Sequence, residues 1–192
     1  MLFSDEKCFY GKGDCGREWV RRPKGEALNP KYCAHKVAHP VNVNVWACFA
    51  RSGQGYLKVF YENMDATVMK NMLQENVIPS VELHWDRAEK WVLLHDNDKK
   101  FTSRKVKEFL HNNCIEVLLI PPYSPDLNPI ENLWAILARA VDRHAADTVE
   151  ELTDVIIEEW KRLDKTVMKN LVDSMLERCA TVVEAKGWHT RW

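Results

Sequence analysis

Apolar and polar positions alternate over much of the first 61 residues, which is typical of strands with one buried face. Val41, Val43 and Val45 alternate with asparagines before an apolar run that includes Trp46 and Phe49. The pattern predicts strands over residues 2–10, 17–22 and 41–50, then a hairpin at Gly53 and Gly55 into a strand over 56–61. Residues 23–40 contain glycine and prolines without a clean period and are predicted to form a long loop.

From residue 65 the apolar positions recur with helical spacing. Five helices are predicted. The first begins at Asp65 and stops at Pro79, and the second covers residues 103–113. The third begins after the N-cap Asn128, the fourth follows the Thr148–Glu151 capping box, and the fifth carries an apolar stripe over residues 168–179. Two short apolar runs, residues 91–94 and 115–120, are predicted to be strands, the second of them buried. An antiparallel meander followed by β-α-β units predicts one α/β domain over residues 1–192, with a central mixed sheet flanked by helices.

Composition narrows the functional classes. The chain has 192 residues, is 46% hydrophobic and carries a net charge of -1, so any surface for nucleic acid must be locally basic. No apolar run reaches the ~18 residues of a membrane span, so no membrane partner is expected. Six cysteines without a C-x-x-C pair indicate reduced thiols.

Three acidic residues lie at the ends of predicted elements. Asp5 lies on the first strand, Asp96 follows the strand over 91–94, and Glu131 lies in the first turn of the helix after Asn128. Such positions converge on one crevice of an α/β sheet, and three carboxylates suit Mg²⁺ or Mn²⁺. Each also has an ordinary explanation: Glu131 as a helix-capping residue, Asp96 as a turn residue and Asp5 as a strand-edge charge.

The sequence around these acids favours the metal site over the ordinary structural roles. Residues 124–134 read SPDLNPIENLW, and the second acid is followed by Asn97, Asp98 and Lys100. Both segments resemble those around the last two acids of Tc/mariner superfamily DDE transposases. The 34 residues between Asp96 and Glu131 match the Asp-Asp-Glu spacing of the Tc branch, and the resemblance covers nearly the whole chain.

The resemblance implies a ribonuclease H-like catalytic domain that cuts and joins DNA in cut-and-paste transposition. It implies that Asp5, Asp96 and Glu131 are the catalytic, metal-binding acids for Mg²⁺ or Mn²⁺, with two ions expected. DNA cleavage and strand transfer (DNA integration) would then proceed by in-line phosphoryl transfer. Lys99, Lys100 and Arg104 are predicted to contact DNA phosphates.

The implied partners are double-stranded DNA, as transposon ends and target, and a second copy in a homodimer; the implied location is the nucleus. Because relatives place helix-turn-helix modules upstream and Asp5 lies four residues after Met1, we expect those modules to be absent. Where relatives usually carry a proline and a histidine, this chain has Lys99 and Phe101. Two alternatives therefore stay open: a catalytically decayed or host-adopted interaction module, and a ribonuclease H-like nuclease acting on RNA–DNA hybrids.

Overall fold

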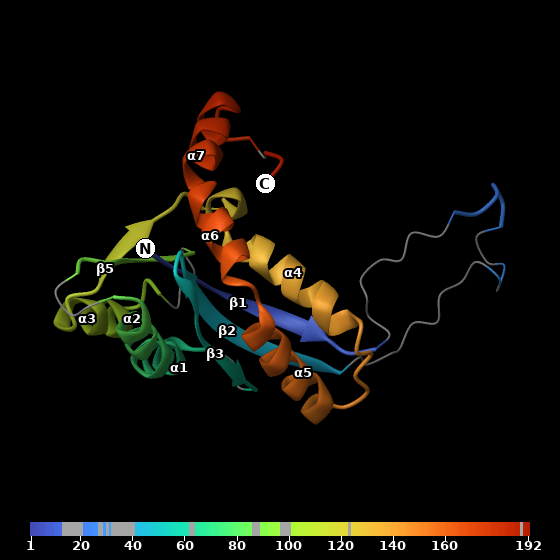
Figure 1. The fold of residues 1–192 in the computed structure, drawn as a ribbon, viewed down its shortest axis with the longest axis horizontal. Helices are drawn as coiled ribbons and strands as arrows, with labels where there is room; N and C mark the ends of the chain where they lie inside the picture. The colour runs from blue at the N-terminus through green and yellow to red at the C-terminus, as the bar shows by residue number, and fades with distance from the viewer. Residues whose placement is uncertain are drawn as a thin grey trace.

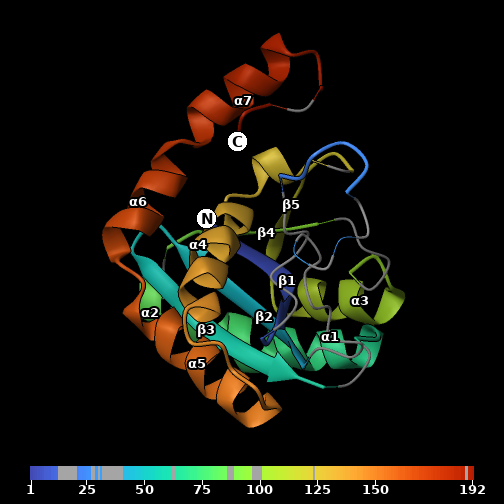
Figure 2. The same cartoon turned by 90° about the vertical axis from the view of Figure 1, so that its right-hand side faces the viewer.

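A five-stranded mixed sheet forms the centre of the protein (Figures 1 and 2). The structure, a computed structural model, describes residues 1–12, 21–26, 29, 31, 41–61, 64–85, 89–96, 101–122, 124–188 and 190–192. The strand order is β3-β2-β1-β4-β5, with β1 antiparallel to β2, β2 antiparallel to β3, and β4 parallel to both β1 and β5. The strands are β1 (Leu2–Tyr10), β2 (Asn42–Ala50), β3 (Gly53–Phe60), β4 (Val92–His95) and β5 (Glu116–Leu119).

Helices cover both faces of the sheet, as Figure 2 shows. One face carries α1 (Ala66–Met72), the π-helical turn η2 (Leu73–Val77), α2 (Ile78–His84) and α3 (Arg104–Asn112). The other face carries α4 (Ile130–Asp142), α5 (Val149–Arg162) and α6 (Lys165–Asp173), with η3 (Pro125–Leu127) before α4 and α7 (Met175–Glu184) after α6. The predicted α/β architecture with a flanked mixed sheet is confirmed.

Alternation along the strands divides the apolar residues between two cores. Phe3 and Leu94 face the core under α4 and α5, whereas their neighbours Leu2 and Leu93 face the core under α1 to α3. The α4 stripe predicted from sequence is fully or nearly fully buried. Strand β1 therefore has structure on both faces, which holds its side chains in fixed positions.

The predicted helix stop at Pro79 is wrong, because the helical path continues to His84. Just before the proline, the Ile78 N–H bonds to the Leu73 carbonyl five residues back, which makes a π-type turn. Pro79 follows as the second residue of α2, and the π-type turn before it accommodates the missing N–H within the continuous helical path.

The predicted burial of residues 115–120 is also wrong for β5. This strand forms at the sheet edge, and Leu118 and Leu119 are 42% and 67% exposed. The predicted last helix divides into α6 and α7 at Ser174, and only Met168 of its apolar stripe is buried. Periodicity correctly predicted a strand and helical structure in these two segments. It could not predict their exposure, because burial depends on whether another element packs against them.

The hairpin after β2 turns at Arg51 and Ser52, two residues earlier than predicted, and β3 begins at Gly53. Gly55 has a packing role, because a Cβ there would lie 2.6 Å from the Cys48 Sγ and 2.7 Å from the Ser80 Oγ. The predicted strand over 17–22 and loop over 23–40 lie largely outside the described residues, and Arg21 and Arg22 lie in no strand. Among the described residues, no helix has the length and apolarity needed to cross a membrane.

Candidate metal centre

Strand register brings Asp5 and Asp96 side by side. Phe3 of β1 pairs with Leu94 of the parallel strand β4. Asp5 and Asp96 each lie two residues beyond this pair, and the negative charge of Asp96 contributes to the raised pKa of Asp5, so the two carboxylates are near each other. Both residues follow Phe3 and Leu94 by two, so alternation directs them to the α4 face of the sheet. These two carboxylates come from distant parts of the sequence and meet where β1 and β4 stop pairing.

The first turn of α4 brings Glu131 to the same place. Asn128, which is 3% exposed, donates a hydrogen bond from its Nδ2 to the carbonyl oxygen of Ser4 at 3.3 Å. Ser4 is the residue before Asp5, so this bond ties the entry of α4 to β1 beside the first acid. Buried Ile130 fixes the helix start from the core side.

The prediction that Asn128 caps α4 with its side chain is wrong. The helix begins at Ile130, Pro129 is the capping residue, and no side chain caps this terminus. The Asn128 amide instead satisfies a strand carbonyl, and its Oδ1 is buried without a hydrogen-bond partner. Sequence reasoning missed this contact because an asparagine before a helix is ordinarily a cap.

The raised pKa of Asp5 indicates that Glu131 and Asp96 lie near it. Burial, reinforced by the negative charges of Glu131 and Asp96, raises the pKa of Asp5 to about 7, while a hydrogen bond from the Glu6 backbone opposes the shift. A group in such a position takes up a proton or a cation near neutral pH, since either relieves the repulsion.

The three carboxylates interact without closing into a ligand set. Across the part of the chain that the structure describes, no group of three or more His, Cys, Asp or Glu side chains is arranged to hold a metal ion. Three carboxylates close together repel one another, and a bound cation would relieve this repulsion. Carboxylate oxygens are the hard ligands that Mg²⁺ and Mn²⁺ prefer, so these residues fit such an ion by the chemistry of their donor atoms. The assignment of Asp5, Asp96 and Glu131 as ligands stays a prediction.

On the other face of β4, His95 packs against Phe101. The imidazole is 3% exposed, its ring centroid lies 3.5 Å from that of Phe101, and its Nδ1 contacts the Asp96 carbonyl. Burial lowers the pKa of His95. Phe101, at a position where the sequence resemblance favours histidine, thus contributes packing behind Asp96.

The predicted DNA contacts are only partly within the described residues. Lys99 and Lys100 lie outside them. Arg104 begins α3 with a 92% exposed side chain, and its Nε lies 3.5 Å from the Glu108 carboxylate. Their predicted role stays a prediction.

Comparison with known proteins identifies the family. The DDE superfamily endonuclease family matches residues 1–153. The chain is 35% identical to the transposable element Tcb1 transposase of Caenorhabditis briggsae and 34% identical to the Tc1 transposase of Caenorhabditis elegans, covering all of this chain and 70% of each relative. The chain belongs to the DDE superfamily of endonucleases. Within it, this is a catalytic domain of the Tc/mariner transposases, as the sequence resemblance predicted.

Solved structures support the fold of this DDE domain. The catalytic domain of Mos1 mariner transposase superposes with a TM-score of 0.76 at 20% identity, covering 99% of this chain and 83% of that one. A Mos1 paired end complex with Mn gives a TM-score of 0.79 at 22% identity, and this chain spans 56% of that protein's length. The predicted ribonuclease H-like fold is confirmed.

Proposed function

We propose that this DDE domain cleaves DNA strands and joins a freed 3′-hydroxyl to target DNA, using divalent metal held by Asp5, Asp96 and Glu131. The observation that carries the proposal is the meeting of these acids from β1, the end of β4 and the start of α4, reported by the raised pKa of Asp5. The family supplies the class of reaction.

The residues of the chain define what the site would do. Asp5 and Asp96 would offer carboxylate oxygens from β1 and from the residue after β4, and Glu131 would offer a third from the start of α4. When bound there, a pair of Mg²⁺ or Mn²⁺ ions would supply the Lewis acidity for in-line displacement at phosphorus. Ionised Asp5 is needed for binding, so protons and metal compete for it near pH 7.

The proposed partners follow from the same class of reaction. Mos1 structures include a paired-end complex with the left transposon end and a strand transfer complex, and others contain Mg or Mn. For this chain we accordingly propose duplex DNA as substrate, a second copy in the active assembly, and the nucleus as location in a eukaryotic host. Lys99, Lys100 and Arg104 are the proposed phosphate contacts.

A matched pair of glutamates tests the proposal. Glu131 and Glu150 both lie in the first turn of a helix, but Glu150 belongs to α5. Mn²⁺ binding and nicking of duplex DNA with exposed ends should be measured for wild type, Glu131→Gln and Glu150→Gln. We expect Glu131→Gln to reduce cleavage to below about 1% of wild type, as for loss of a group that stabilises transition-state charge, and Glu150→Gln to behave as wild type.

The same assay separates the alternatives. If none of the three proteins bound Mn²⁺ or cleaved DNA, the result would contradict the proposal and favour an interaction module. Preferential cutting of an RNA–DNA hybrid over duplex DNA would favour a hybrid nuclease.

A further inference from the structure

The segment before Glu131 is also contacted by α7 and by the residues after α7. Asp126 lies in η3, five residues before Glu131. Its backbone carbonyl accepts a hydrogen bond from the Arg178 Nη1 at 3.1 Å, and its Oδ2 accepts from the Thr190 N–H and Oγ1, each at 2.8 Å. Residues from α7 and from the segment after it therefore hold both the backbone and the side chain of Asp126.

Arg178 is buried to an unusual degree for a cation, with 1% of the residue exposed. Its Nε donates to the Ser174 Oγ at 2.9 Å, and its guanidinium lies 4.6 Å from the ring centroid of Trp192. Burial lowers the pKa of Arg178, and the negative charge of Asp126 opposes that shift. A buried cation is tolerated only where such partners compensate its lost hydration. We call Asp126, Arg178, Thr190 and Trp192 the Arg178 latch.

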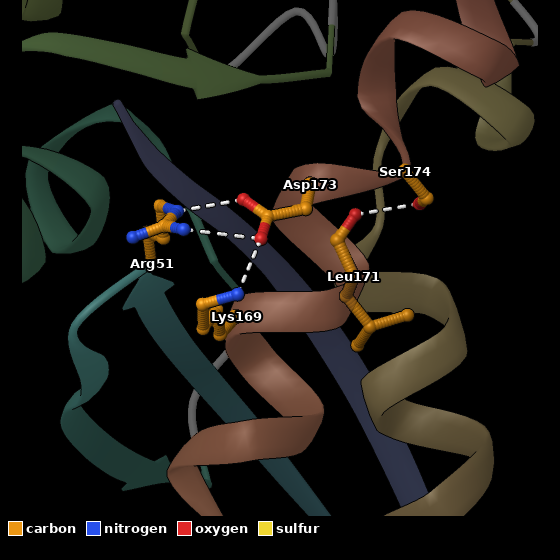
Figure 3. A network of polar contacts seen from close by, with 5 residues as sticks. All are labelled: Arg51, Lys169, Leu171, Asp173 and Ser174. Carbon is orange, nitrogen blue, oxygen red and sulfur yellow. Dashed lines mark hydrogen bonds and ion pairs between the residues drawn. The ribbon is translucent and has the colours of Figure 1, made fainter.

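The latch is anchored to the body of the protein through α6. At the end of this helix Asp173 forms a two-point contact with Arg51 of the β2–β3 turn and a further ion pair with Lys169 (Figure 3). The next residue, Ser174, donates to the Leu171 carbonyl at 2.7 Å and accepts from Arg178. The guanidinium thus lies between an anchored helix end and η3.

The path from the latch to the site is short and rigid. Asp126 is held by the latch, Asn128 is held by the Ser4 carbonyl beside Asp5, and Pro129 has a fixed φ. Both ends of the segment before Glu131 are consequently fixed, one by α7 and the segment after it and one by β1.

We infer that Arg178 and Thr190 are positioning residues, which set the place of Glu131 relative to Asp5 and Asp96 and thereby the affinity of the site for divalent metal. The inference rests on the proposed function, because it assigns these residues a role in the same metal centre. Neither residue is a catalytic residue, since each acts through Asp126. Supporting contacts around metal ligands typically change metal affinity by 10- to 100-fold.

Two variants with matched controls test the inference. Arg178→Met removes the buried cation, with Arg162→Met in α5 as control for the loss of an arginine. Thr190→Val removes the Oγ1 donor without the risk of misfolding a buried site, with Thr181→Val in α7 as control. Wild type and all four variants should be compared for Mn²⁺ affinity, for DNA nicking across a Mn²⁺ series, and for hydrogen exchange at the Leu127 and Asn128 amides, which bond to the Ser124 and Pro125 carbonyls.

We expect Arg178→Met and Thr190→Val to weaken Mn²⁺ binding by about 10-fold, to lose nicking at low Mn²⁺ and recover it at saturating Mn²⁺, and to exchange faster at both amides. Both controls should match wild type. Faster exchange with unchanged Mn²⁺ affinity would show a merely structural contact and overturn the inference. Equal Mn²⁺ binding by all five proteins would overturn this inference alone, whereas absence of binding by wild type would overturn the proposed function as well.

Discussion

Helices α4 and α7 have similar apolar periodicity but different means of attachment. Along α4 the stripe is buried, and Trp134 packs against Phe9 and Trp160 with ring centroids 5.9 and 5.8 Å apart. Along α7, Leu176 and Val183 are 86% and 76% exposed, and the helix extends away from the sheet (Figures 1 and 2). At its first residue, Met175, α7 packs against the core, and further along it is held by the polar contacts of Arg178. The helix that carries Glu131 is fixed by a core, and the helix that buttresses its entry is fixed by hydrogen bonds.

Truncating one apolar side chain on each helix should give the largest contrast. Trp134→Ala creates a cavity beneath α4 and should lower the free energy of unfolding by about 3–5 kcal/mol. Leu176→Ala removes an exposed side chain and should change it by less than about 0.5 kcal/mol. Denaturant unfolding of both variants beside wild type measures the difference, and comparable losses would mean that α7 is covered in solution.

Replacing Asp5 in the site at the start of α4 should change the free energy of unfolding by an amount that depends on pH. The pKa of Asp5 is about 7 in the folded protein against an ordinary value of 3.8, so the folded state binds the proton more tightly. The resulting stability is fully present below about pH 4 and is lost as pH rises through 7. Without metal, Asp5→Asn should therefore match wild type at pH 4 and exceed its unfolding free energy at pH 8 by up to about 4 kcal/mol, the equivalent of the pKa shift.

Divalent metal should reverse that order. Mg²⁺ or Mn²⁺ binds the folded wild type and stabilises it by mass action, whereas Asp5→Asn loses a ligand. If wild type were the more stable protein at pH 8 even without metal, the account of charge repulsion at this site would be wrong.

The smallest effect is expected at the anchor of α6. Two charged partners, Arg51 and Lys169, lower the pKa of Asp173 to about 2, with hydrogen bonds as the largest cause. The ion pairs are exposed and screened by solvent, so Asp173→Asn should cost little stability. Because the folded-state pKa is depressed, the difference from wild type should be present above about pH 4 and disappear as pH falls toward 2. High salt should also reduce it.

Much of this fold could be predicted from sequence because its elements have clear periods. Strand β1 matched the predicted residues 2–10, and α3 lies within the predicted residues 103–113, after the N-cap Ser103, whose Oγ accepts from the Val106 N–H. The capping box at Thr148 also formed in part: its Oγ1 accepts from the Glu151 N–H, but the Glu151 carboxylate accepts from the Asp147 N–H, one residue earlier than in the reciprocal pattern. These features depend on local sequence.

The remainder depends on contacts between distant residues. The adjacency of Asp5 and Asp96 follows from the β1–β4 register, which periodicity alone does not give. The roles of Asn128 and Arg178 come from carbonyls that lie 124 and 52 residues away. The exposure of β5 and α7 reflects missing cover, which a sequence pattern cannot specify.

The most direct test of the central claim is a crystal structure of the wild-type domain in saturating Mn²⁺ at pH 8, with anomalous scattering to locate the metal. The account predicts anomalous density between the carboxylates of Asp5, Asp96 and Glu131, in contact with all three. Density bound elsewhere, or none among these carboxylates under saturating conditions, would contradict it.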